Sequence, residues 1–141
     1  MKSISFFLSL ALLSTAVVFS SCKKDEEQQE DTTPTPTPQA VITINDPLPN
    51  AMFSLNDEVH IDVDITASFE MHGYMVELIN ETSGEVVWTT DAHDHGNSFH
   101  IHDHWVNNVT DHSDMKLRVT AELDHDGATT VKEVHFHCHP M

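Results

Sequence analysis

Basic residues, cysteines and glycines are all scarce in this 141-residue chain. Six Lys and Arg stand against 23 Asp and Glu, and the formal charge of −17 would repel nucleic acid rather than attract it. Two cysteines are too few for the disulfide framework of a small secreted scaffold. The length allows one ordinary domain and excludes a multidomain enzyme. The residue in excess is histidine, with twelve copies.

Motifs of common catalytic chemistry are also missing. The chain has no Gly-x-Ser-x-Gly nucleophile elbow, no His-Glu-x-x-His, and only four glycines with which to build a phosphate-binding loop. Acidic pairs such as Asp62 and Asp64 alternate with apolar residues, which predicts a solvated strand face. We therefore expect the chain not to be an enzyme.

The first 21 residues have the layout of a secretory signal peptide. Lys2 precedes an apolar run from Ile4 to Phe19, which is short for a bilayer-spanning helix, and two serines follow. The next residue, Cys22, resembles the cysteine of a bacterial lipobox, which is lipidated and becomes the mature N-terminus. The resemblance implies that a lipid at Cys22 attaches the chain to a membrane. An uncleaved anchor and an ordinary signal peptide are the alternatives.

Residues 22–39 are predicted to form an acidic, proline-rich linker. Lys23 follows the cysteine in place of the Asp that marks inner-membrane retention in some bacteria, so the resemblance favours an outer-membrane lipoprotein. The acidic run 25–31 is similar to tags that send some lipoproteins to the cell surface, although a solvated spacer would look the same. The Thr/Pro stretch 32–38 should stay extended as a stalk. The protein could thus face the periplasm or the cell exterior.

The folded domain is predicted to span residues 40–141, where all twelve histidines lie. Apolar and polar residues alternate with period two, and no window keeps a helical period. Turn residues separate seven predicted strands, at 41–45, 58–67, 72–80, 85–90, 98–103, 115–123 and 130–138. Seven short strands in about 100 residues predict an all-β, Ig-like antiparallel β-sandwich.

The stretch 45–59 resembles the opening of bacterial Ig-like domains, in which a strand ends at a proline and an Asn-Asp pair begins the next strand. Residues 22–141 as a whole are similar to small His-rich Ig-like bacterial lipoproteins of unknown function. These carry a His-x-His-Gly motif after the middle strands, here His93-Asp94-His95-Gly96. The resemblance implies the sandwich fold and carries no established activity.

The strand order predicts where the histidines gather. If consecutive strands alternate in direction, the loops after the second, fourth and sixth strands share one end of the sandwich. That end should collect His72, His93, His95 and His125, with His100 nearby. The other end should collect His60, His104, His112, His137 and His139, near Cys138 and Met141, with His102 and His135 lying between the ends.

Histidines at alternate positions are the candidate metal ligands. Residues i and i+2 of a strand point to one face about 6.5–7 Å apart, so two imidazoles can converge on one cation. The eight candidates are His93, His95, His100, His102, His104, His135, His137 and His139. Such sites suit a divalent transition metal, Zn(II), Cu(II) or Ni(II). Cys138 would add softness, but it alternates with the histidines and is predicted to be a buried core thiol.

Two families fit less well. Phe99-His100-Ile101-His102 resembles a strand of copper–zinc superoxide dismutases, but no glycine-rich loop, bridging histidine or disulfide pair accompanies it. Periplasmic Ig-like copper carriers bind through a mature N-terminal histidine, where this chain has Cys22. We expect a lipid-anchored protein that binds metal for storage, buffering or delivery, with a metal transporter or surface protein as a possible partner. The alternative is an Ig-like adhesion or assembly module with pH-sensitive histidines and no metal role.

Overall fold

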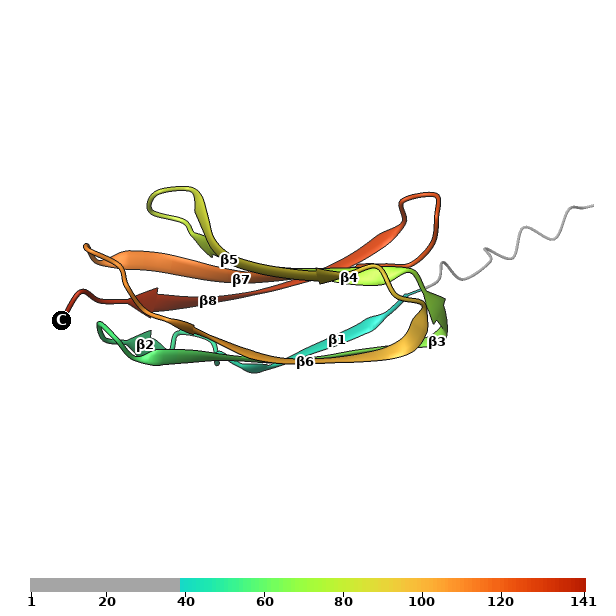
Figure 1. Ribbon diagram of the computed structural model, residues 1–141, viewed down its shortest axis with the longest axis horizontal. Helices are drawn as coiled ribbons and strands as arrows, with labels where there is room; N and C mark the ends of the chain where they lie inside the picture. The colour runs from blue at the N-terminus through green and yellow to red at the C-terminus, as the bar shows by residue number, and fades with distance from the viewer. Residues whose placement is uncertain (1–38) are drawn as a thin grey trace, which may run out of the picture. The chain divides into compact units, whose positions relative to one another are not determined.

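The computed structural model describes residues 39–141. The predicted leader 1–21, the lipidation of Cys22 and the linker up to residue 38 lie outside the described residues. Eight strands make up the domain, which is drawn in Figure 1. They are β1 (Val41–Asp46), β2 (Met52–Phe53), β3 (Glu58–Met71), β4 (Gly73–Asn80), β5 (Glu85–Ala92), β6 (Gly96–Val106), β7 (Ser113–Glu122) and β8 (Thr129–Cys138).

The strands form two sheets that pack face to face (Figure 1). One sheet has the order β1-β3-β6, and the other has the order β2-β8-β7-β4-β5. Neighbouring strands run antiparallel except for the short parallel pair of β2 with β8. This confirms the predicted all-β sandwich. Within residues 39–141 there is no helix of the length and apolarity needed to cross a bilayer.

The strand boundaries differ from the predicted ones in two ways. The two residues of β2 were not predicted as a strand, because a segment this short carries no period. The strands β3 and β6 are longer than predicted, and they run on to Met71 and Val106 where the apolar alternation weakens. Pairing accounts for the extension of β6, whose residues 104–106 continue the ladder opposite residues 58–60, whereas β3 beyond Thr66 pairs with β6 only at Met71.

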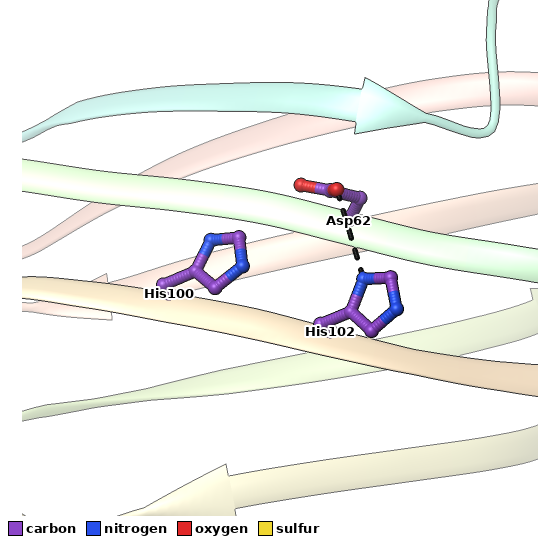
Figure 2. A group of neighbouring side chains, drawn as sticks. All are labelled: Asp62, His100 and His102. Atoms are coloured by element: carbon purple, nitrogen blue, oxygen red, sulfur yellow. Dashed lines mark ion pairs between the residues drawn. The ribbon is translucent and has the colours of Figure 1, made fainter.

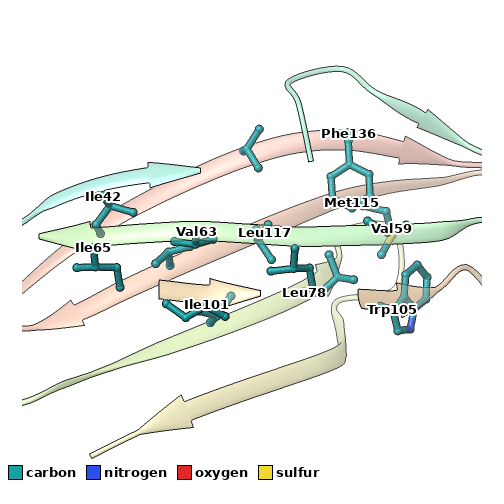
Figure 3. Close-up of a cluster of buried hydrophobic side chains, with 14 of the residues drawn as sticks. Ile42, Val59, Val63, Ile65, Leu78, Ile101, Trp105, Met115, Leu117 and Phe136 are labelled. Carbon is teal, nitrogen blue, oxygen red and sulfur yellow. The ribbon is translucent and has the colours of Figure 1, made fainter. Parts of the chain in front are cut away.

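The core lies between the sheets and is built from the inward half of each alternating strand. Val59, Ile61, Val63 and Ile65 of β3 are fully buried, and so are the alternate residues of β7 beginning with Met115. Figure 3 shows these side chains meeting between the layers. Among residues 39–141, twenty hydrophobic residues are buried, from Ala40 to Cys138. This segment therefore has a complete core of its own and is the unit that folds.

Gly73 allows a close approach of two strands, and Asn107 joins three segments through hydrogen bonds. Gly73 has a φ of 155°, and a Cβ there would overlap the carbonyl oxygen of Ala92, so only glycine fits where β4 begins beside the end of β5. Asn107 is fully buried, and its side-chain amide donates to the carbonyl oxygens of Phe53 at 3.2 Å and His139 at 3.1 Å. It thereby ties β2 and the C-terminal segment to the loop after β6.

Candidate metal centres

The outward face of the three-stranded sheet carries a ladder of imidazoles and carboxylates. In the pairing of β3 with β6, Asp62 lies opposite His102 and Asp64 lies opposite His100. The next pair on the same face is His60 with His104. Alternate residues of a strand share a face, so the polar half of two adjacent strands gives three consecutive cross-strand pairs.

Three of these residues, Asp62, His100 and His102, bring one ligand atom each within 4.8 Å of the others. Figure 2 shows the two rings side by side on β6 with Asp62 above them. The rings are stacked, with centroids 6.3 Å apart and planes 12° apart. We call this set the ladder group.

Each carboxylate of the ladder group's face lies beside the Nδ1 atom of an imidazole ring. The Nδ1 atom of His100 lies 2.9 Å from Oδ1 of Asp64, and Nδ1 of His102 lies 3.7 Å from Oδ2 of Asp62. Asn45 donates to both carboxylates at 2.9 Å. The hydrogen bond with His100, followed by that from Asn45, holds the pKa of Asp64 below its usual value. When Nδ1 donates to a carboxylate, the lone pair of the neutral ring lies on Nε2, which is the arrangement of metal-binding histidines.

A second set, the C-terminal group, consists of His112, Asp114 and His137, whose ligand atoms also lie within 4.8 Å of one another. His137 of β8 lies opposite Asp114 of β7, and its Nδ1 is 2.9 Å from Oδ1 of that carboxylate. The ring of His112 stacks on His137 with centroids 6.1 Å apart. His139 adjoins the group, since its Nδ1 lies 3.0 Å from Nδ1 of His112.

His135 has a different environment although it is two residues from His137. Its Nδ1 lies 2.9 Å from Oε2 of Glu81, and Lys116 is its partner across the strands. The Lys116 ammonium is 3.3 Å from the same Glu81 carboxylate. The hydrogen bond with His135, supported by Lys116, lowers the pKa of Glu81. This carboxylate is already neutralised by a cation, so the position suits a second cation poorly.

The third set, which we call the end cluster, consists of His72, His93, His95 and His125. The ring of His72 lies 3.4 Å from His125, 4.4 Å from His95 and 6.1 Å from His93, centroid to centroid. These rings come from the three loops that topology predicted to share one end, and the predicted gathering is observed. Burial, followed by the charges of the neighbouring imidazoles, lowers the pKa of His72.

The eight predicted ligands are divided among different surroundings. The structure brings His100 and His102 together, places His137 with His112, and places His93 and His95 in the end cluster. The triplets do not stay together: His104 lies opposite His60, and His135 binds Glu81. A strand keeps side chains of one face parallel and evenly spaced, so a third imidazole moves away from the first two.

Sequence reasoning missed the carboxylates. Asp62 and Asp64 were assigned to a solvated face; they do lie on it, but each pairs with an imidazole of the next strand. Asp114 was not a candidate, and His112 was predicted to lie at the same end as His137 and His139, as it does, but was not among the eight predicted ligands. The signal that would have found Asp62 and Asp64 is the antiparallel register, which aligns Asp-x-Asp on one strand with His-x-His on the other.

Cys138 is a core thiol, as predicted. Its side chain is fully buried, and burial, with a smaller contribution from Asp57, raises the pKa of the thiol to about 12. A neutral thiol facing the interior cannot ligate an ion held on the outer face. The softness that it would have added to a copper site is therefore absent from the C-terminal group.

No family model matches the chain, and no curated protein matches it. One solved structure that it resembles is that of the fibronectin(III)-like modules of Clostridium thermocellum CbhA, with 13% identity and a TM-score of 0.46. The match covers 72% of this chain and 98% of that one.

Proposed function

We propose that this protein is a lipid-anchored envelope protein that binds Zn(II), Cu(II) or Ni(II) through clustered histidines, and that it stores, buffers or delivers the metal rather than transforming a substrate. The observation that carries the proposal is the presence of two separate groups, each with two imidazoles and a carboxylate whose ligand atoms lie within 4.8 Å. One group lies on the outward face of each sheet.

The chemistry of these groups favours borderline transition metals over Mg²⁺ or Ca²⁺. Imidazole nitrogen is a poor ligand for the hard cations, which prefer oxygen. Each group supplies three protein ligands on an exposed surface, and water or a partner's side chain would complete the shell. The domain from residue 40 has eighteen acidic and three basic residues, a formal charge of −15 that raises the local concentration of cations.

Calorimetric titration of the isolated domain, residues 39–141, tests the proposal. We expect Zn(II), Cu(II) or Ni(II) to bind more tightly than about 100 μM near neutral pH and to raise the unfolding temperature. Binding should weaken towards about pH 5, because protons compete for the imidazole nitrogens. Replacing His102 and His137 by Gln should remove the heat that belongs to these two groups, whereas His60→Gln, outside both groups, should not.

The rival reading is an adhesion or assembly module. Such a domain would carry no metal after purification without chelator and would gain no stability on metal addition, and either result would contradict our proposal. Anchoring is tested separately: Cys22→Ser should abolish incorporation of a labelled fatty acid and release the chain from the outer-membrane fraction. Capture of a metal transporter or surface protein by the metal-loaded form would identify the recipient.

A further inference from the structure

Four imidazoles meet at the end of the sandwich where the β3–β4, β5–β6 and β7–β8 connections lie. His72 is at their centre, and the other three rings have their centroids within 6.1 Å of it. His95 and His125 are also 6.1 Å apart. The end cluster shares no residue with the ladder group or the C-terminal group.

His72 differs from an ordinary surface histidine. It is only 8% exposed, whereas the three rings around it are exposed. No buried side-chain nitrogen or oxygen among residues 39–141 is left without a hydrogen-bond partner, so any nitrogen of His72 that makes no bond reaches solvent. The groups around His72 are further imidazoles, and a shared ion would take one nitrogen from each ring.

The centroids of the rings are spaced much as ligands of one ion would be, and small rotations would bring their nitrogens together, since among residues 39–141 only the other two groups have ligand atoms within 4.8 Å of one another. A metal–nitrogen bond of about 2.0–2.1 Å places the ring centroid about 3 Å from the ion, so two tetrahedral ligands have centroids about 5 Å apart. The pairs of His72 with His95 at 4.4 Å and with His93 at 6.1 Å lie on either side of this value. The 3.4 Å contact of His72 with His125 would have to open, and His125 is exposed and free to move outward.

Carboxylates stand behind the outer rings. Oε2 of Glu122 is 3.5 Å from Nδ1 of His93, and Oε1 of Glu70 is 3.5 Å from Nδ1 of His95. Such partners orient a ring and leave its Nε2 to the ion. A cavity of about 330 Å³ adjoins His72 and is lined in addition by His93, His125 and Asp124. It has room for the ion and for several waters, each of which takes about 30 Å³.

We propose that the end cluster is a separate, nitrogen-rich metal site that binds a divalent transition metal through three or four imidazoles, with Cu(II) held most tightly. It extends the proposed function and rests on it. The site differs from the two outer-face groups in its donors, since those bind through imidazole and carboxylate together. It also differs in enclosure, because His72 lies inside the domain.

The test isolates the end cluster by disabling the other two groups in the 39–141 domain, with His100, His102, His112 and His137 all replaced by Gln. We expect this variant to retain one tightly bound Cu(II), whose electron paramagnetic resonance spectrum shows hyperfine coupling to three or more nitrogens. Adding His95→Gln and His125→Gln should lower the affinity for that Cu(II) by more than about 100-fold. Loss of a residue that only hydrogen-bonds to a metal ligand lowers the affinity by roughly 10–100-fold. The matched control adds His60→Gln and His104→Gln instead and should change neither quantity.

Thermal unfolding in EDTA verifies that each variant is folded, and both added substitutions lie at exposed positions. If the His95/His125 variant keeps the same tight Cu(II) and the same spectrum, the end cluster is not the site and this inference is overturned. The proposed function would still stand if the wild-type domain lost metal with the ladder and C-terminal substitutions. Failure of the wild-type domain to bind any of the three metals would overturn both.

Discussion

The outward faces of the two sheets carry the same His-x-His pattern, but the charged residues around the two patterns differ. On β6, His100 and His102 face Asp64 and Asp62 across the strands. On β8, His137 also faces an aspartate, but His135 faces Lys116. The spacing along the strand is identical in the two cases, so the residue across the strand decides the charge at each imidazole.

The basic side chains of the domain lie away from the ladder group. Lys116 and Arg118 of β7 bind Glu133 at 3.5 Å and 2.8 Å, and Lys132 donates to the carbonyl oxygen of Ile42. These are the three Lys and Arg residues from residue 40 onward. In the part of the chain that the structure describes, the ladder carboxylates therefore have only imidazoles and Asn45 as partners, and their charge is available to a metal cation.

The largest effect on bound metal should come from removing the ligands of the ladder group. Replacing both His100 and His102 by Gln removes two of its three ligands, and we expect the domain to lose one bound metal per chain by elemental analysis. His135→Gln is the matched control on the other sheet and should leave the amount of bound metal unchanged. Equal loss from the two variants would show that the opposing charge does not matter.

A smaller change in metal affinity should follow when the positive charge beside His135 is removed. Lys116→Gln removes the cation beside Glu81, so the Glu81–His135 pair should become a better site. One charge at about 4 Å in water is worth about 1 kcal/mol, so we expect the weakest metal-binding step to tighten about fivefold in a calorimetric titration. Arg118→Gln, which leaves the Glu81–Lys116 pair intact, is the comparison. A weaker step after Lys116→Gln would contradict this electrostatic account.

The pH dependence of unfolding should show whether the Asp64–His100 pair stabilises the fold. Because the folded-state pKa of Asp64 lies below its ordinary value of 3.8, its pairing stabilises the fold above that pH, and the contribution is lost as pH falls through the folded-state pKa. Asp64→Asn should therefore flatten the fall of the urea midpoint below about pH 4. Asp103→Asn, on the same strand as His100, serves as the control. An unchanged slope for Asp64→Asn would mean that the pair adds no stability.

The smallest effect on metal affinity is expected from Cys138, on the inward side of β8. Cys138→Ala should leave metal affinity within about twofold, because the buried thiol reaches no ion on the outer face, while stability falls by about 1 kcal/mol. The native thiol should resist a thiol reagent at pH 8, since its pKa is about 12, and should react once the domain is unfolded. Rapid labelling of the native domain, or a large loss of metal affinity, would place the thiol in a site.

The fold and the broad placement of the histidines could be predicted, whereas the composition of each group could not. Period-two alternation was enough to assign β3, β7 and β8 and to place Cys138 inside. The strand order was enough to bring His72, His93, His95 and His125 to one end. The aspartates of the ladder could not be assigned, because an acidic residue on a polar strand face reads as solvated until its neighbour across the sheet is known.

The sequence by itself determined which face of each strand is exposed to solvent, since alternate side chains point to opposite faces whatever the strand pairs with. That rule placed the histidines of β6 and β8 outside and the apolar residues inside. Only the tertiary structure decided which side chains meet across the strands, since register is set by long-range packing and by turns. A two-residue shift of β6 against β3 would keep the polar and apolar faces and place a different residue opposite each imidazole.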